Sequence, residues 1–160
     1  MKGWKRATVI VGFLVVAAPS GGSETALQPD TRAIEATVLA VHADMTRAGE
    51  AVDADRLFSF MLDTDRGSVI QNGEMFATRR EALERVRANL NGVGRVQYRW
   101  TRELVSVLSP EVAVLNAEGE STVTLSSGDT FTAPLAQSVV FVLRGGAWKA
   151  IHAHQSSPRR

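Results

Sequence analysis

Residues 130–144, TFTAPLAQSVVFVLR, decide the fold class of this chain. Within them the run at 138–143, SVVFVL, carries apolar side chains on both of its alternating faces. A strand with one face in water would alternate apolar and polar residues, so this run predicts a strand that is covered on both sides. We therefore expect a sheet with a layer of protein against each of its faces.

Three further segments around this run have the composition of strands. Residues 95–108, 112–125 and 147–155 are rich in β-branched and aromatic residues and show no helical period. Short turn sequences connect the four segments, as at Ser109-Pro110 and Gly145-Gly146. Because connections this short join neighbouring strands, the second half of the chain predicts an antiparallel meander.

The first half of the chain begins with two predicted helices. Apolar residues recur at helical spacing in its first segment, at Ile34, Val38, Val41 and Met45. Asp30 or Thr31 can cap the start of this helix with a side-chain oxygen. A shorter helix is predicted at 54–62, with Asp53 as its cap.

A short strand and a third helix come next. Residues 67–71 have strand composition, and Asn72-Gly73 after them is the strongest dipeptide signal for a tight turn. The stretch 78–81, TRRE, has the form of a capping box, in which the Thr78 hydroxyl and the Glu81 carboxylate each satisfy a free amide. The third helix therefore begins at Thr78.

The N-terminal 22 residues have the layout of a secretory signal peptide. Lys2, Lys5 and Arg6 precede an apolar run of 12 residues at 7–18, and small residues follow it. A helix needs about 20 apolar residues to span a bilayer, so this run favours cleavage over a stable membrane anchor. We therefore predict an exported protein, either periplasmic or extracellular.

Length and composition suit one globular domain. A chain of 160 residues is long enough for one hydrophobic core. Its charged fraction of 22% is close to the average for soluble globular proteins. We assign a linker to 23–30, the domain to 31–157 and a tail to 158–160. The chain has no cysteine, which excludes disulfides and thiolate metal sites, and no basic run that would suit nucleic acid.

The helices can cover only one face of the predicted sheet. The run at 138–143 still places apolar side chains on the other face, and the chain offers no further element to cover them. A second copy of the chain would do so. We therefore predict a homodimer that forms through the sheet.

The C-terminal hairpin carries a resemblance to a known family. Gly145-Gly146 is followed by Trp148, by Ile151 three positions on, and by a His-x-His ending at residues 152–156. With the order of helices and strands, this resembles the SnoaL-like branch of the nuclear transport factor 2-like superfamily over residues 31–157.

The resemblance implies an α+β fold that is shaped like a cone, also described as a cystatin-like roll. Three N-terminal helices would pack on a curved antiparallel sheet, a pocket would open at one end, and dimers would form through the sheet. The superfamily includes isomerases, dehydratases, epoxide hydrolases and polyketide cyclases, together with members that catalyse nothing. Fold alone therefore does not give the reaction.

Three residues are candidates for catalysis. His152 and His154 lie two apart on a predicted strand, so their side chains share a face and can act as general acid or base on a bound molecule. Tyr98 can donate a hydrogen bond to a developing oxyanion. The alternative for the histidines is a structural role, in hydrogen bonds across the sheet or at the dimer contact.

Five other residues are candidates for binding a ligand. Aromatic and sulfur-containing side chains are expected on the walls and lid of an apolar pocket, and one carboxylate on a strand is a candidate polar contact. These residues are Phe58, Phe60, Met75, Trp100 and Glu118. By strict alternation, Val96, Tyr98, Trp100 and Arg102 would share one strand face, and Glu103 would lie on the other.

Three hypotheses follow for the function. The first is a pocket that binds a small hydrophobic or carboxylate-bearing molecule without transforming it. The second is a lyase or isomerase without cofactor, in the range of isomerases, dehydratases and cyclases, with a histidine as the proton shuttle. The third is a structural dimer whose cavity is filled by its own side chains. The sequence contains no motif for a nucleotide cofactor, and we expect no metal site.

Overall fold

The computed structural model of the chain describes residues 30–64 and 67–157. Its three helices are α1 at Thr31–Glu50, α2 at Ala54–Ser59 and α3 at Arg79–Asn89. Two short strands precede α3, namely β1 at Ser68–Gln71 and β2 at Glu74–Phe76. Four long strands follow it, namely β3 at Val93–Ser109, β4 at Val112–Leu125, β5 at Thr130–Arg144 and β6 at Ala147–Ser156. The predicted signal peptide and tail lie outside the described residues.

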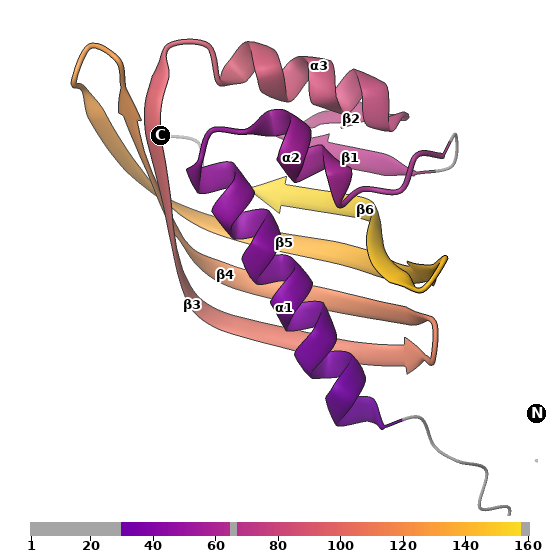
Figure 1. Cartoon of the computed structure of the whole chain (residues 1–160). Helices are drawn as coiled ribbons and strands as arrows, with labels where there is room; N and C mark the ends of the chain where they lie inside the picture. The colour runs from indigo at the N-terminus through magenta and orange to yellow at the C-terminus, as the bar shows by residue number, and fades with distance from the viewer. Residues whose placement is uncertain (1–29, 65–66, 158–160) are drawn as a thin grey trace, which may run out of the picture.

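The six strands form one sheet in the order β2-β1-β6-β5-β4-β3 (Figure 1). The four long strands pair antiparallel with their neighbours in sequence, which confirms the predicted meander. β1 pairs with β6 in parallel, and β2 pairs with β1 antiparallel. The sheet is therefore mixed at this edge. A parallel pair needs a long connection, and here α3 and the strands β3, β4 and β5 lie between β1 and β6 in the chain.

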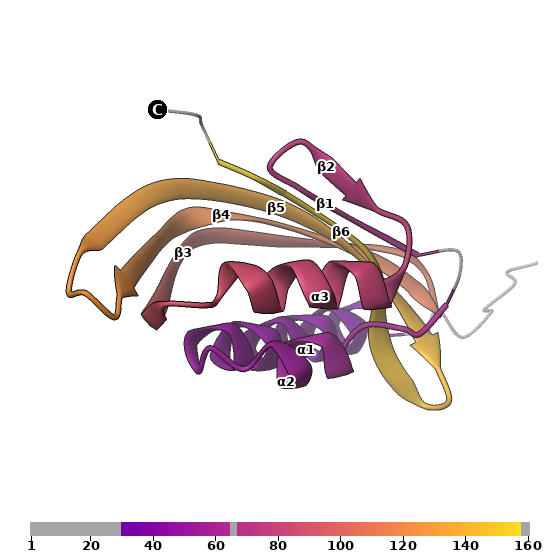
Figure 2. The same cartoon turned by 90° about the horizontal axis from the view of Figure 1, so that it is seen from above.

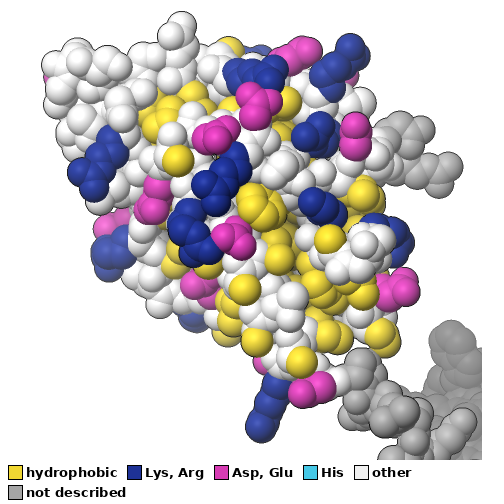
Figure 3. Space-filling model, in the orientation of Figure 1, with side chains coloured by type: hydrophobic (Ala, Val, Ile, Leu, Met, Phe, Trp, Pro, Cys, Tyr) yellow, Lys and Arg dark blue, Asp and Glu magenta, His cyan; other side chains and the backbone are white. Residues whose placement is uncertain are grey.

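The sheet is curved, and all three helices lie on its concave side (Figure 2). α1 contacts β3, β4 and β6, whereas α3 contacts α2, β1 and β2. Acidic and basic side chains lie close together on the helix side (Figure 3), as in the ion pairs of Arg47 with Asp44 and of Arg87 with Asp55. The arrangement confirms the predicted cone-shaped α+β fold.

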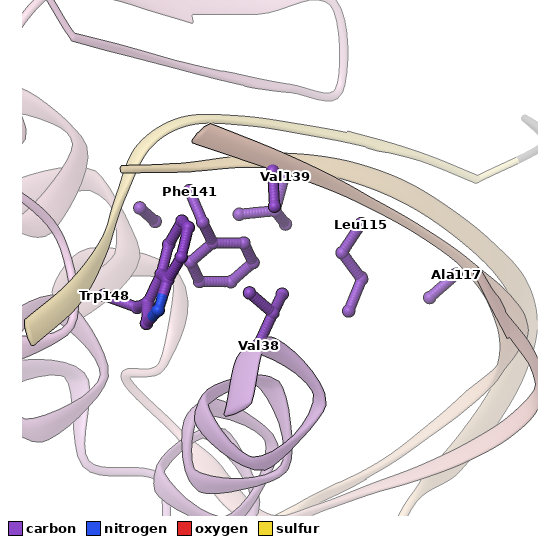
Figure 4. Close-up of a cluster of buried hydrophobic side chains, with 8 residues drawn as sticks. Val38, Leu115, Ala117, Val139, Phe141 and Trp148 are labelled. Carbon is purple, nitrogen blue, oxygen red and sulfur yellow. The ribbon is translucent and has the colours of Figure 1, made fainter. Parts of the chain in front are cut away.

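The main hydrophobic core lies between α1 and the long strands (Figure 4). Val38 of α1 packs with Leu115 of β4 and with Val139 and Phe141 of β5, and none of these side chains is more than 1% exposed. Burying each one stabilises the fold by about 1.5–3 kcal/mol. The core thereby fixes α1 on the sheet, and with it His42, which lies one turn further along the same side of the helix.

The predicted helix starts are confirmed. Asp30, Asp53 and Thr78 each accept hydrogen bonds from amides of the helix that follows them. The Glu81 carboxylate accepts from the Ala77 amide at 3.1 Å, so the capping box closes one residue before its usual position. Local side-chain chemistry therefore sets where these helices begin.

The end of α2 and the hairpin after it differ from the prediction. α2 stops at Ser59 rather than at residue 62, because the chain then joins the sheet and the Leu62 amide donates to the Ala150 carbonyl at 2.8 Å. Asn72 and Gly73 have positive φ angles of 55° and 84°, as the tight turn requires. The turn leads into β2, a strand that the sequence pattern did not predict.

The convex face is apolar only in part. Val142 is 6% exposed within a single chain, so part of the run at 138–143 needs no partner to cover it. Leu104 and Leu108 of β3 are 53% and 65% exposed. The homodimer stays a prediction, and these two leucines are side chains that a second copy would cover.

Candidate functional site

A cavity of about 170 Å³ lies between the helices and the concave face of the sheet. Most of the side chains that line it are apolar, among them Met45, Leu57, Phe58, Met61 and Val139. An apolar cavity of about 150 Å³ is large enough to hold benzene. This cavity therefore has room for a molecule built on a single ring.

His42 of α1 lines the cavity and is 1% exposed. Its Nδ1 lies 2.6 Å from Oε1 of Glu103 on β3, and its Nε2 lies 2.5 Å from Nε2 of Gln137 on β5. An amide nitrogen can only donate, so Nε2 of His42 accepts and the ring proton is on Nδ1, which donates to the carboxylate. The two contacts define a neutral imidazole with a fixed tautomer.

Electrostatics favour the same state of His42. Burial lowers the pKa of His42 below its ordinary value, and the hydrogen bond and charge of Glu103 only partly oppose this. The imidazole also lies against the Trp100 ring, with 5.1 Å between the ring centroids. His42 is thus held at neutral pH as a hydrogen-bond acceptor in largely apolar surroundings.

A directed chain of glutamine side chains leads to His42. Gln71 of β1 donates to Gln155 of β6 at 2.9 Å, and Gln155 donates to Gln137 of β5 at 3.0 Å. Gln137 then donates to His42, which donates to Glu103. Because each amide donates in the same direction, one consistent set of hydrogen bonds runs across the concave face.

A β-bulge brings Glu103 to the concave face. β3 and β4 pair Trp100 with Gly119 and Arg102 with Glu118, so one extra residue lies between the two pairs on β3. Strict alternation predicted Trp100 and Arg102 on one face with Glu103 opposite. That prediction is wrong, because the bulge shifts the alternation by one and places Glu103 with Trp100.

Gly119 allows this bulge. A Cβ atom at Gly119 would lie 2.1 Å from the Arg99 carbonyl oxygen, a distance that no side chain can occupy. The close approach of the two backbones therefore requires glycine at this position. The geometry that joins Glu103 to His42 depends on it.

Tyr98 and Trp100 form an aromatic wall of the cavity. Their rings are stacked, with an interplanar angle of 4° and 5.6 Å between centroids. Trp100 Nε1 donates to the Thr46 hydroxyl at 3.0 Å, and the Tyr98 amide donates to Glu50 at 3.0 Å. Burial raises the pKa of the Tyr98 hydroxyl, and the charge of Glu50 raises it further, so this hydroxyl stays protonated.

The two C-terminal histidines lie on the other face of the sheet. His154 borders a hollow on the convex side, whereas its neighbours Ala153 and Gln155 line the concave cavity. His152 shares the face of His154, and its Nδ1 lies 2.8 Å from the Ser68 hydroxyl across the pairing of β6 with β1. The structure therefore does not bring the predicted catalytic histidines together with Tyr98.

The predicted binding residues are divided between several places. Phe58 and Trp100 line the cavity. Phe60 is not among the lining residues, and Met75 is 68% exposed in β2. Glu118 lies on the convex face, where Oε1 is 3.2 Å from Nε of Arg102.

The convex hollow, about 210 Å³, differs in chemistry from the cavity. The side chains of Arg102 and Glu118, which border it, are 63% and 53% exposed. Ser138 donates to Asn116 at 2.6 Å on the same face. Water competes for exposed groups of this kind, so the concave cavity is the better candidate for a ligand site.

Sequence reasoning missed the most buried polar group of the site. His42 lies four residues after Val38 and three before Met45, so it belongs to the apolar stripe of α1. A histidine on an apolar helix stripe is the sequence signal that could have indicated a buried polar group here. Nothing in the sequence indicated that Glu103 and Gln137, far away along the chain, would meet it.

Among residues 30–64 and 67–157, no three His, Asp or Glu side chains gather as metal ligands. None of the helices in those ranges combines the length and apolar character needed to cross a bilayer.

Comparison with known proteins gives a family match over most of the chain. The SnoaL-like domain model matches residues 38–160. No curated protein matches the sequence.

Solved structures share the fold at low identity. A protein of the nuclear transport factor 2-like family from Streptomyces avermitilis is 20% identical, with a TM-score of 0.71 over 82% of this chain and 100% of that chain. A superfamily protein from Salmonella enterica is 13% identical, with a TM-score of 0.73 over 81% and 94%. A hexachlorocyclohexane dehydrochlorinase is 14% identical, with a TM-score of 0.69 over 81% and 88%. These likenesses extend to the fold alone.

Proposed function

Because the chain belongs to the SnoaL-like domain family of the nuclear transport factor 2-like superfamily, we propose that it binds one small, largely apolar molecule in the cavity beneath its helices. The observation that carries this function is the cavity of about 170 Å³ with mostly apolar walls. Binding pockets combine such walls with a few placed polar groups. Here those groups are His42, Gln137 and Tyr98.

Binding without chemistry agrees best with the hydrogen bonds of the site. Both ring nitrogens of His42 are already occupied, one by Glu103 and one by Gln137. A base must have a free lone pair close to the proton that it removes. With these contacts in place His42 has no free lone pair, whereas an apolar molecule can bind without disturbing them.

The proposal is tested by filling the cavity. Ala153 of β6 lines the cavity, and Ala136 of the neighbouring strand borders the convex hollow. Toluene and 4-methylcyclohexanone should raise the Tm of the wild type and of Ala136→Leu, and should leave the Tm of Ala153→Leu unchanged. Ala153→Val, with a smaller side chain, covers the case in which the leucine variant fails to fold. Equal shifts in Ala153→Leu and Ala136→Leu would place the ligand elsewhere.

A proton-transfer lyase or isomerase is the second candidate function. It is favoured by one observation, the 2.6 Å contact through which Glu103 orients His42. If a ligand displaces Gln137, His42 Nε2 becomes free to take a proton from the carbon next to a carbonyl, while the Tyr98 hydroxyl donates to the enolate oxygen. The same nitrogen then returns a proton to that carbon or to a leaving group.

Exchange of hydrogen for deuterium separates the two functions. In D₂O, an enzyme of this kind would exchange the hydrogens next to the carbonyl of 4-methylcyclohexanone, followed by NMR, and His42→Asn would abolish the exchange. His154→Asn, on the convex face, is the matched control. A protein that binds the ketone and catalyses no exchange above the buffer rate is a binder only.

We also propose that the protein is exported and forms a homodimer. Export rests on the basic start and the apolar run of residues 1–22. The dimer rests on the exposed Leu104 of the convex face and on the exposed Leu108, further along the same strand. Light scattering tests the dimer, because Leu104→Glu should then yield a monomer, and a wild type that is monomeric at micromolar concentration would contradict it.

A further inference from the structure

The charged side chain that lines the cavity is acidic. Among the described residues that line it there is no Lys or Arg, whereas Asp53 does line it. Two further carboxylates contact residues of its wall, because Oε1 of Glu50 accepts from the Tyr98 amide and Oε1 of Glu103 accepts from His42. A bound anion would meet these carboxylates with no Lys or Arg among the described lining residues to offset the loss of water.

The remaining polar groups of the cavity suit a neutral molecule. The glutamine chain ends at His42 Nε2, which is an acceptor, and its partner Gln137 is a neutral amide. Burial lowers the pKa of His42, so the imidazole does not supply a positive charge at neutral pH. The polar part of the cavity thus offers dipoles rather than ionic partners.

The Tyr98 hydroxyl is free to bind a ligand. This hydroxyl has no hydrogen-bond partner among the described residues, and Tyr98 lines the cavity. A raised pKa keeps this hydroxyl protonated, so it can donate to an oxygen atom of a bound molecule. The other polar groups that the deep wall presents, namely the His42 ring, the Gln137 amide and the Trp100 indole, already have partners inside the protein.

Gly49 provides the space for this hydroxyl. A Cβ atom at Gly49 would lie 3.0 Å from Cε2 and 3.4 Å from the hydroxyl oxygen of Tyr98. A side chain there would push the ring out of its stacked position against Trp100. The glycine on α1 therefore keeps the flat aromatic wall and its polar end in place.

We propose that the molecule bound in the cavity is an uncharged single-ring compound with one hydroxyl or carbonyl oxygen, held by the Tyr98 hydroxyl, and that the matching carboxylate is rejected. The inference rests on the proposed function, because it gives the chemistry of the molecule that the cavity binds. Of the two ligand classes predicted from the sequence, this proposal keeps the hydrophobic molecule and not the carboxylate-bearing one.

Three probes with the same methylated ring test this inference. Toluene has no polar group, p-cresol adds a neutral hydroxyl, and p-toluate adds a negative charge at pH 7.5. Calorimetric titration of the full-length protein should show that p-cresol binds with an affinity at least fivefold higher than that of toluene, as the net free energy of one hydrogen bond allows. p-Toluate should bind at least 100-fold more weakly than p-cresol.

A hydroxyl deletion assigns the effect to Tyr98. In Tyr98→Phe, p-cresol should bind no more tightly than toluene, while toluene should bind as it does to the wild type. Ser138→Ala, which removes a hydroxyl from the convex face of β5, should leave all three affinities unchanged. The unchanged affinity for toluene also shows that the variant remains folded.

The outcomes distinguish this inference from the function on which it rests. If neither toluene nor p-cresol binds, the proposed function fails. If toluene binds as tightly as p-cresol, or if p-toluate binds tightest, the function stands and the inference is overturned. Retention of the p-cresol preference in Tyr98→Phe would also overturn it.

Discussion

The two faces of the sheet are built from neighbouring residues, yet their chemistry is opposite. Gln137 and Ser138 are adjacent in β5, but Gln137 belongs to the buried chain that ends at His42 and Glu103, whereas Ser138 donates to a residue of the convex face. On the concave side, polar groups bind one another in apolar surroundings. On the convex side, they pair in water. The side of the sheet that α1 covers therefore decides what each residue does.

The largest difference between the faces should appear when a leucine is truncated. Leu115 is fully buried on the concave side, and Leu104 on the convex side is 53% exposed. Leu115→Ala should lower the free energy of unfolding by about 2–5 kcal/mol, whereas Leu104→Ala should change that of the dilute, monomeric protein by about 0.5 kcal/mol or less. Urea denaturation measures both. A large loss for Leu104→Ala that grows with protein concentration would indicate burial in a dimer.

The β-bulge that places Glu103 on the concave face can be tested by a substitution at Gly119. Gly119→Ala places a methyl group against the Arg99 carbonyl, and relieving this contact should cost about 1–3 kcal/mol. The control is Gly94→Ala, since a Cβ atom there would lie 3.5 Å from its nearest neighbour. Circular dichroism during thermal denaturation gives both values. A stable Gly119→Ala protein would show that the bulge is not fixed by this close approach.

Acid should destabilise the concave face through His42. The folded-state pKa of His42 is lowered from its ordinary value of 6.5, so below that pH the unfolded chain binds a proton that the folded chain does not. The free energy of unfolding should therefore fall as the pH decreases from about 7 toward 5, and it should fall less in His42→Gln. Identical slopes for the two proteins would contradict a neutral buried His42.

A small effect is expected for the ion pair on the convex face. Arg102 and Glu118 are more than half exposed, and exposed pairs contribute about 0–1 kcal/mol. Arg102→Ala should therefore lower stability by at most about 1 kcal/mol, and 1 M NaCl should reduce that difference. A loss as large as that of Leu115→Ala would mean that this pair is buried in the protein in solution.

The fold could be predicted from the sequence because its signals are local. The caps at Asp30, Asp53 and Thr78, the Asn72-Gly73 turn and the β-branched run around Val139 each specify their own segment. These signals fixed the helices and the meander. The parallel pairing of β1 with β6 joins distant segments, and no local pattern predicts it.

The site could be predicted only in part, because it depends on which face each strand turns toward the helices. Period-two alternation correctly paired Tyr98 with Trp100, but it could not detect the bulge that moves Glu103. The same alternation put His152 and His154 on one face without indicating that this face is the convex one. Contacts such as that of His42 with Glu103 come from packing, which the sequence pattern does not contain.

The most direct test of the difference between the two faces is the position of a bound ring. Intermolecular NOEs between p-cresol and the methyl-labelled protein locate the ligand without further assumptions. The concave cavity predicts NOEs from the ring protons to Met45 and Val139, which line it. NOEs to the Leu104 methyl groups, on the convex face, would contradict it.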